Sequence, residues 1–229
     1  MRHVVLDIET VPDPDFPPPE KEVGSPASSV VVAIGCLYFE DYLPSKIGLI
    51  RESGSEAEKI ADLMAWLGSV KPTIVSWNGR GFDMPVLSAR ALRYGVPMPW
   101  WYESRNTRYR YSTEGHFDLM DFLADHGAGR NMRLGDVAKL VGFPGKMGVD
   151  GSQVGTMMAE EGGPKAVGTY CLCDVAQTAA VFLRVELLRG EIDRATYLGL
   201  ASKYLQFLDA EPRIAELAGK IDQPRFLLE

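Results

Sequence analysis

Cysteine is scarce in this sequence, and no long apolar run is present. Three cysteines among 229 residues are too few for the disulfide framework of a small secreted domain. No stretch approaches the roughly 20 consecutive apolar residues that a membrane-spanning helix needs. The first residues also lack a basic segment followed by an apolar one, so we expect no secretory signal. These absences predict a protein of the reducing cytoplasm with no part in a membrane.

The three cysteines, Cys36, Cys171 and Cys173, are predicted to be small buried hydrophobic side chains. A single C-x-C pair is too small a ligand set to indicate a zinc site. Internal repeats are absent too, and the only low-complexity tract is a proline cluster between residues 12 and 26, which predicts a surface loop. With 46% hydrophobic residues, the chain is expected to form one domain over residues 1–229, of which about 191–229 are a C-terminal helical extension.

The net charge of −7 argues against a protein that coats nucleic acid, but it is compatible with a nuclease. A metal-dependent nuclease concentrates carboxylates at its centre and can keep its basic groups local. Between residues 80 and 110 the chain has six arginines and only two acids, Asp83 and Glu103. A positive segment of this kind inside an acidic protein is a candidate surface for nucleic acid.

The hydrophobic pattern predicts an α/β fold. Strand-like runs fall at residues 3–6, 30–39, 46–50 and 73–77, and helical patterns at 56–67, 84–94, 117–123, 133–141, 152–161, 164–188, 194–208 and 213–220. The order β-β-β-α-β-α followed by helices indicates a mixed sheet with helices on both faces. Adjacency of consecutive elements places the first strand in the middle of the sheet.

Asp7 and Glu9 end the first apolar run, and they are the most informative pair in the chain. Residues two apart on a strand project from the same face, so the two carboxylates are expected to point together. Oxygen ligands at that spacing suit a hard divalent cation such as Mg²⁺ or Mn²⁺. An isolated D-x-E is more often a strand end that turns into solvent, so the prediction depends on further acids downstream.

Those acids occur at two later places. Asp83 lies where the strand at 73–77 turns into a helix, and alone it would be interpreted as a helix N-cap. Tyr170 and Asp174 are four residues apart in the apolar helix predicted over 164–188, so they share one helix face. Alone, the tyrosine could be a core residue and the aspartate could pair with an arginine. Burying an unpaired carboxylate is costly, however, and three such places in order favour a shared metal site.

Together the three places resemble the motifs of the DEDD superfamily of 3′–5′ exonucleases, which have an RNase H-like fold. Residues 7–9 are similar to the first motif, D-x-E, residues 78–83 to the second, N-x-x-x-[FY]-D, and residues 170–174 to the third, Y-x-x-x-D. Tyr170 is typical of the DEDDy branch, whereas Thr169 stands where the DEDDh branch has histidine. The resemblance covers about residues 1–190 and extends to stand-alone bacterial proteins similar to the exonuclease domain of family B DNA polymerases.

The resemblance implies a two-metal hydrolysis of phosphodiester bonds at 3′ ends, with Mg²⁺ or Mn²⁺ as the two cations. Asp7, Glu9 and Asp174 would bind the metal that activates water, with Asp7 bridging to the second metal. Asp83 would hold that second metal, and Tyr170 would orient the attacking water. Single-stranded DNA is the favoured substrate, in a setting such as DNA repair, because the tyrosine branch includes DNA proofreading domains.

Substrate contacts are predicted from several places outside the acids. The segment 100–111 interleaves aromatic residues with Arg108 and Arg110, which could stack bases and bind phosphates; equally, it could be a surface loop whose tryptophans pack on the core. Asn78 and Phe82 of the second motif are candidate contacts as well. Lys146 could reach a phosphate, although its glycine-rich turn is no P-loop. The three histidines are predicted to be structural or surface residues. Asp118 or Asp121 could support the metal ligands, but a solvated helix start is the favoured interpretation of both.

Three other functions remain open. RNA is a serious alternative substrate, because the tyrosine branch also contains RNA-processing enzymes. A protein that binds nucleic-acid ends or assists a polymerase without cutting would be expected to lack one of the carboxylates, and none is missing. An RNase H-like endonuclease fits the tyrosine and the N-x-x-x-F-D motif less well. The sequence gives no indication of a protein partner.

Overall fold

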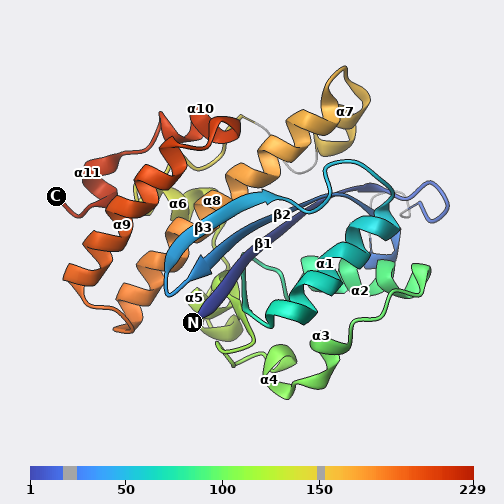
Figure 1. Cartoon of the computed structure of the whole chain (residues 1–229), viewed down its shortest axis with the longest axis horizontal. Helices are drawn as coiled ribbons and strands as arrows, with labels where there is room; N and C mark the ends of the chain where they lie inside the picture. Colours follow the sequence, from blue (N-terminus) through green and yellow to red (C-terminus); the bar gives the residue numbers. More distant parts are fainter. Residues whose placement is uncertain (18–24, 149–152) are drawn as a thin grey trace.

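A five-stranded mixed sheet lies at the centre of the protein, in a computed structural model that describes residues 1–17, 25–148 and 153–229 (Figure 1). Its strands are β1 (Arg2–Pro12), β2 (Ser29–Glu40), β3 (Leu43–Leu49), β4 (Thr73–Ser76) and β5 (His116–Asp118), in the spatial order β3-β2-β1-β4-β5. β1 pairs antiparallel with β2 and parallel with β4. The prediction that the strand carrying Asp7 lies mid-sheet is therefore confirmed.

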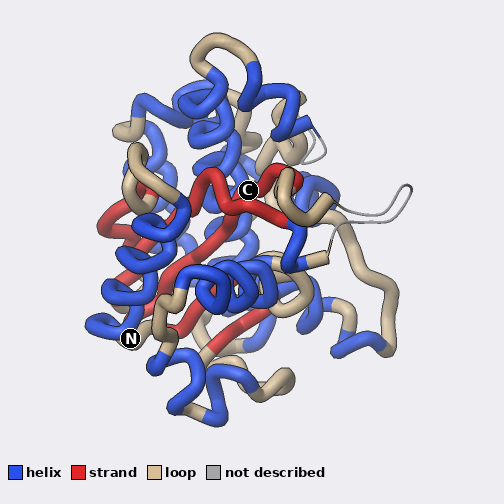
Figure 2. The backbone as a smooth tube through the Cα atoms, turned by 90° about the vertical axis from the view of Figure 1, so that its right-hand side faces the viewer, coloured by secondary structure: helices blue, strands red, loops and turns tan. Residues whose placement is uncertain are grey.

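Helices cover both faces of this sheet, as the two views in Figure 1 and Figure 2 show. α1 (Glu56–Val70) and α2 (Asp83–Tyr94) share a core with one face, and α8 (Gly163–Arg189) and α9 (Arg194–Asp209) share a core with the other. The shorter α-helices are α3 (Pro99–Glu103), α4 (Arg105–Arg108), α5 (Leu119–Leu123), α6 (Leu134–Leu140), α7 (Val154–Ala159), α10 (Ala215–Ala218) and α11 (Gln223–Phe226). The predicted α/β class, with the order β-β-β-α-β-α and then helices, is confirmed.

Local sequence rules account for the helix ends near the site. Ser55 and Glu58 form the capping box that opens α1, each side chain accepting from the other's backbone N–H. Gly95 ends α2 in the left-handed conformation (φ 65°), which glycine adopts without strain. Both caps use residue types that are typical of helix ends. They fix the two helices that pack beneath β1.

Three predicted helices differ from the structure. The segment 117–123 begins as strand β5 and becomes helix α5 only at Leu119, because a three-residue strand is too short to show an alternating pattern. The helix predicted over 152–161 is α7, from Val154 to Ala159, and residue 152 lies outside the described residues. The helix predicted over 213–220 is a 3₁₀ turn, η4 (Pro212–Ile214), followed by the single-turn α10.

Helix α8 approaches the sheet closely at Gly35 of β2, the register partner of Asp7. A Cβ atom at Gly35 would lie 2.8 Å from the Sγ of Cys171 and 3.0 Å from a methyl group of Val175. Because real Cβ atoms do not tolerate a contact of 2.8 Å, the glycine is what lets this helix lie against the two central strands. The third predicted motif is carried on the same part of α8.

The C-terminal helices share the core formed by α8. The hydroxyl of Tyr204 in α9 donates to the carbonyl of Ala176 in α8 at 2.7 Å, and Tyr197 donates to the carbonyl of Phe226 at 2.7 Å. Whether residues 191–229 belong to a single domain with the rest stays a prediction. Among the described residues, none of the helices combines the length and apolar character that crossing a membrane requires.

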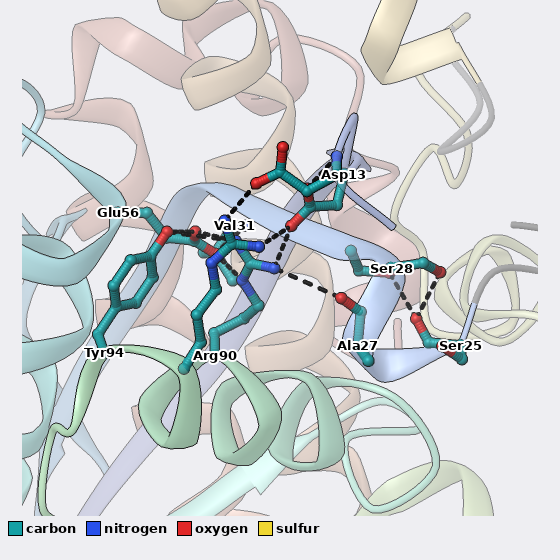
Figure 3. Close-up of polar contacts among 11 residues, drawn as sticks. Asp13, Ser25, Ala27, Ser28, Val31, Glu56, Arg90 and Tyr94 are labelled. Carbon is teal, nitrogen blue, oxygen red and sulfur yellow. Dashed lines mark hydrogen bonds and ion pairs between the residues drawn. The ribbon is translucent and has the colours of Figure 1, made fainter. Parts of the chain in front are cut away.

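A buried ion cluster joins the end of β1 to α1 and α2 (Figure 3). Arg90 of α2 is 2% exposed and lies between Asp13, also 2% exposed, and Glu56 of α1. Its guanidinium donates to both carboxylate oxygens of Glu56, at 2.6 and 2.7 Å, and to Asp13. Glu56 also accepts the backbone N–H of Val31 in β2 at 2.7 Å. The cluster thus fixes α2 against the two central strands.

Candidate metal centre

The central strand presents its two acids toward α8. Val4, Leu6 and Ile8 point into the core beneath α1 and α2, so the alternate residues face the other side of the sheet. Asp7 and Glu9 are on that other side, and Glu9 is only 7% exposed whereas Asp7 is partly exposed. The expectation that both carboxylates share one strand face agrees with this placement.

Asp83 reaches the same strand from the start of α2. It is the first residue of the helix, and the cap position belongs to Phe82, so the interpretation of Asp83 as an N-cap is not needed. Its Oδ1 accepts the backbone N–H of Ile8 at 3.1 Å, and the residue is 3% exposed. The hydrogen bond holds this carboxylate beside β1, between the positions of Asp7 and Glu9 along the strand.

A tight turn at Asn78 delivers Asp83 to this position. Asn78 has a positive φ of 64°, which asparagine tolerates better than most residues, and its carbonyl accepts from the N–H groups of Gly81 and Phe82. The backbone N–H groups of Asn78 and Arg80 donate to the two oxygens of Asp118 at 3.0 and 2.9 Å. Asn78 therefore shapes the loop, whatever contact its side chain makes with a substrate.

The third element is α8, which carries Tyr170 and Asp174 on one face. The hydroxyl of Tyr170 hydrogen-bonds Asp174 one turn away, and Gln177 donates to Asp174 Oδ1 at 3.4 Å. Both Tyr170 and Asp174 are partly exposed. The structure thus brings together all five predicted catalytic residues, from β1, α2 and α8. Their catalytic roles stay a prediction.

Cys171 also belongs to this cluster, which the sequence did not indicate. Its Sγ lies 3.5 Å from both the backbone carbonyl and the Oδ2 of Asp7. One ligand atom from each of Asp7, Glu9 and Cys171 lies within 4.8 Å of the others, the only such group among the residues that the structure describes. Asp83 and Asp174 lie outside that tight group. All three cysteines are buried, as predicted.

Burial raises the pKa of all four carboxyls, and neighbouring acids of the site raise it further at Asp7 and Glu9. Burial and then Glu9, Asp83 and Asp174 raise the pKa of Asp7 well above its ordinary value. Burial, Asp174 and Asp83 raise the pKa of Glu9 to about 9. Burial raises the pKa of Asp83 to about 7 and that of Asp174 to about 6, even though hydrogen bonds favour both carboxylates. Burial and then Asp174 and Glu9 raise the pKa of the Tyr170 hydroxyl as well.

No basic side chain of the described residues forms an ion pair with any of these acids. The clearest case is Glu9, a residue that is only 7% exposed and whose carboxylate has neither a hydrogen bond nor an ion pair within the described chain. A buried carboxylate without a partner is costly, and oxygen donors converging from three elements are the ligands that Mg²⁺ and Mn²⁺ prefer. The residues present therefore fit a divalent cation.

A cavity of about 600 Å³ opens beside the loop that leads to Asp83. Its lining includes Asn78, Arg80, Trp101, Arg108 and Arg110. The structure thus places three predicted substrate contacts around one cavity, while Phe82, 37% exposed, lies at the start of α2. Lys146 is exposed and lies after α6, away from the lining of this cavity.

The arginines around the cavity already contact other groups of the chain, and the strength of these contacts differs. Arg110 forms a bidentate ion pair with Asp121, so its charge is largely neutralised. Arg80 donates to the carbonyls of Arg108, Tyr109 and His116, so it holds residues 108–116 beside the loop at Asn78. The sequence did not indicate this role. The guanidinium of Arg108 lies over the ring of Tyr102, with 5.2 Å between guanidinium carbon and ring centroid.

The aromatic segment 100–111 divides into a buried part and an exposed part. Trp100 and Trp101, 8% and 7% exposed, pack into the core beneath α1 and α2, as one of the two sequence interpretations expected. Tyr102, Tyr109 and Tyr111 are 46–57% exposed, so only these rings are available to stack on bases. The segment is not a loop throughout, because α3 and α4 occupy much of it.

Asp118 lies at a helix start, as predicted, but the expectation that it is solvated was wrong. This residue is 4% exposed, caps α5 and accepts four backbone N–H groups, two of them from the loop at Asn78 and Arg80. Its neighbour His116 is fully buried and hydrogen-bonds Ser76 at 2.7 Å. Asp118 thus positions the second-motif loop rather than facing water.

The profile of one protein family matches residues 26–220, and its description is a predicted 3′–5′ exonuclease related to the exonuclease domain of PolB. This match spans far more than half of the chain. The chain belongs to this family. No curated protein sequence matches it. The predicted membership is confirmed, and the second and third motifs lie inside the matched region, whereas Asp7 and Glu9 precede it.

Solved structures of two proteins are similar to this family member. The family B DNA polymerase from Pyrobaculum calidifontis aligns with a TM-score of 0.61 at 20% identity, covering 99% of this chain and 28% of the polymerase. Exonuclease I in a product-bound structure aligns with a TM-score of 0.43 at 14% identity, covering 82% of this chain and 43% of the other. The chain thus spans less than a third of the polymerase, and that likeness shows the shared RNase H-like fold alone.

Proposed function

We propose that this protein is a metal-dependent exonuclease that removes nucleotides from the 3′ end of nucleic acid. The observation that carries the proposal is the convergence of Asp7, Glu9, Asp83 and Asp174 in one place with no cation of the described chain among them. Family membership supports the same activity.

Each residue of the site has a role in this proposal. Asp7, Glu9 and Asp174 would hold one divalent cation and Asp83 a second, with Asp7 between the two. When bound, the cations supply charge stabilisation for the attacking and leaving oxygens of the phosphodiester. The Tyr170 hydroxyl, which donates to Asp174 in the structure, would turn to orient the attacking water. Its raised pKa keeps it a neutral hydrogen-bond donor at physiological pH.

Single-stranded DNA is the favoured substrate, and Mg²⁺ or Mn²⁺ the favoured cations. The family is described as related to a DNA polymerase's exonuclease domain, which supports DNA. RNA is the second candidate. A role limited to end binding is opposed by the complete set of carboxylates, each placed at the cluster.

The decisive experiment uses 5′-labelled single-stranded DNA and the matching RNA, each with Mg²⁺, Mn²⁺ or EDTA. A ladder that shortens from the 3′ end, only with metal, is the expected result, and the faster ladder identifies the preferred sugar. Asp174→Ala should abolish the ladder while Asp209→Ala, an exposed aspartate at the end of α9, leaves it unchanged. Wild-type turnover in Asp174→Ala would refute the metal assignment.

Tyr170→Phe separates the chemical step from metal binding. The variant should cleave at least roughly tenfold more slowly, because misplacing a reacting group can cost about 10²-fold. Because phenylalanine removes no metal ligand, Mn²⁺ affinity measured by calorimetry should stay at the wild-type value. Normal turnover in this variant would remove the tyrosine from the mechanism.

The cavity beside Asn78 supplies a test of the substrate path. Arg108→Ala combined with Arg110→Ala should weaken binding of single-stranded DNA and reduce the salt slope by up to about 0.7 per lost phosphate contact. Arg194→Ala, an exposed arginine at the start of α9, is the matched control. Equal affinities at several salt concentrations would exclude this cavity from the path.

A further inference from the structure

A buried thiol stands in contact with the two strand carboxylates. The Sγ of Cys171 lies 3.5 Å from Asp7 Oδ2 and belongs to the tight group with Asp7 and Glu9. Cys36 packs in the core beneath α1 and α2, on the opposite face of the sheet. Cys173 borders a separate cavity near Met157 and Leu217. Only Cys171 is therefore placed to share a ligand with the acids.

A second, independent observation points to a missing ligand here. Glu9 is only 7% exposed, one of its carboxylate oxygens lies within 4.8 Å of ligand atoms of Asp7 and Cys171, and it has no hydrogen bond or ion pair with a described residue. A buried carboxylate in this state lacks a cationic partner. A cation among Glu9, Asp7 and the thiol would contact one ligand atom of each.

The chemistry of these three donors differs from that of an all-oxygen site. Oxygen donors suit Mg²⁺ and Mn²⁺, whereas a thiolate beside carboxylates selects a thiophilic cation such as Zn²⁺ or Cd²⁺. Zinc sites with three protein ligands keep a fourth position open for water or substrate. Zinc bonds of about 2.0–2.3 Å place tetrahedral ligand atoms about 3.5 Å apart. The separation of at most 4.8 Å in the structure therefore needs side-chain movements of about 1 Å.

We infer that Asp7, Glu9 and Cys171 form a binding site for a thiophilic divalent cation, with Zn²⁺ as the physiological candidate. When the cation binds, a metal–sulfur bond forms, the S–H bond breaks and its proton passes to solvent, with no change of oxidation state. The inference rests on the proposed function only in that Asp7 and Glu9 also serve the hydrolytic cations. Zn²⁺ therefore competes with Mg²⁺ and Mn²⁺ for the same two carboxylates and stops hydrolysis.

Cadmium reports the sulfur bond directly, because a cadmium–thiolate bond has a charge-transfer band in the ultraviolet. The variant Cys36→Ser combined with Cys173→Ser keeps Cys171 as its only thiol, and Cd²⁺ titration should give this band at one equivalent. Cys171→Ser alone keeps the other two thiols and should lose the band. A band that persists in Cys171→Ser, or none in the variant that keeps only Cys171, would overturn the inference.

Zinc affinity gives a second measurement on folded protein. Removing groups that only support metal ligands costs about 10–100-fold in affinity, so losing a direct ligand in Cys171→Ser should weaken Zn²⁺ at least roughly tenfold. Mn²⁺ affinity should change less than threefold, and a normal Mn²⁺ isotherm also shows that the variant is folded. Equal weakening of both ions would assign Cys171 a packing role and reject the inference.

The two proposals fail in distinguishable ways. A cadmium–thiolate band in a protein that cleaves no nucleic acid would retain the thiophilic site and reject the exonuclease. Metal-dependent cleavage that Zn²⁺ does not inhibit, with no band, would retain the exonuclease and reject the thiophilic site. Glu9→Gln should weaken Cd²⁺ binding while Cys171 is intact, which ties the sulfur site to the strand carboxylate.

Discussion

Two buried clusters of charge are attached to the same strand and are built in opposite ways. At the end of β1, Asp13 and Glu56 enclose Arg90, so each carboxylate has a basic partner at hydrogen-bond distance (Figure 3). Four residues earlier, Glu9 lies beside other acids with no basic partner in the described chain. The strand and α2 are common to both, so the difference comes from the residues that meet the strand: Arg90 at one cluster, and Asp83 with α8 at the other.

The comparison shows how a fold separates structural acids from reactive ones. Although burial alone would raise it, the hydrogen bond from Arg90 lowers the pKa of Asp13 below its ordinary value. Burial and the neighbouring acids raise the pKa of Glu9 to about 9. The first cluster is complete in itself, whereas the second is complete only with an added cation.

Breaking the ion cluster around Arg90 should have the largest effect on the free energy of unfolding. Arg90→Met leaves Asp13 and Glu56 buried without their basic partner, and loss of one partner of a buried pair costs about 3–5 kcal/mol. Urea unfolding should show this loss, with or without metal. Arg93→Met, which removes a partner of Asp13 that is 34% exposed, should cost much less. A loss below about 1 kcal/mol for Arg90→Met would show that the cluster contributes little.

Adding a cation to the acids around Glu9 should have the next largest effect on the free energy of unfolding. Mn²⁺ at 100 times its dissociation constant should raise the free energy of unfolding by about 2.7 kcal/mol, because the ion binds only the folded chain. The gain should vanish in Glu9→Gln and persist in Arg93→Met. Denaturant curves in EDTA and in Mn²⁺ measure both, and an equal gain in Glu9→Gln would place the ion elsewhere.

The pH dependence should differ in sign between the two clusters. The pKa values of Glu9, Asp83 and Asp174, about 9, 7 and 6, lie above those of the unfolded chain, so their contribution to stability is present at low pH and lost as pH rises from about 5 to 9. Asp13, with its lowered pKa, contributes stability that is lost on acidification instead.

Urea midpoints measured in EDTA from pH 5 to 9 test this directly. The wild-type midpoint should fall across that range, and saturating Mn²⁺ should flatten the curve. A midpoint that rises with pH in EDTA would contradict the raised pKa values.

The smallest effect expected is a gain in stability from a loss of charge. In EDTA, Asp7→Asn should raise the free energy of unfolding by about 1 kcal/mol, because it removes one of the mutually repelling carboxyls. Asp209→Asn, on the exposed end of α9, should leave it unchanged. Destabilisation by Asp7→Asn without metal would mean that another group already compensates this acid.

The predictable part of the site follows from local periodicity. Asp7 and Glu9 share a face because strands alternate, and Tyr170 and Asp174 share one because helices repeat about every four residues. The position of β1 in the middle of the sheet followed from adjacency of consecutive elements. These rules act within one element, so the sequence alone was enough for them.

The unpredicted part depends on packing between elements. Cys171 reaches Asp7 because α8 lies against β2 at Gly35, a contact that no local pattern indicates. Asp118 is buried because β5 is only three residues long and carries it under the loop at Asn78. The burial of Trp101 rather than its exposure was likewise settled by the short α3 packing on the core.

Gly35 determines how closely α8 can approach the sheet, and so how close the residues of the site lie to one another. The sheet carries Asp7 and Glu9 and α8 carries Asp174, and only the hydrogen atom at the Gly35 Cα lies between the sheet and this helix. A single added methyl group at Gly35 would push α8 away from the sheet without touching any reacting atom. A substitution at this unreactive position is thus expected to disturb the site although it changes none of the carboxylates.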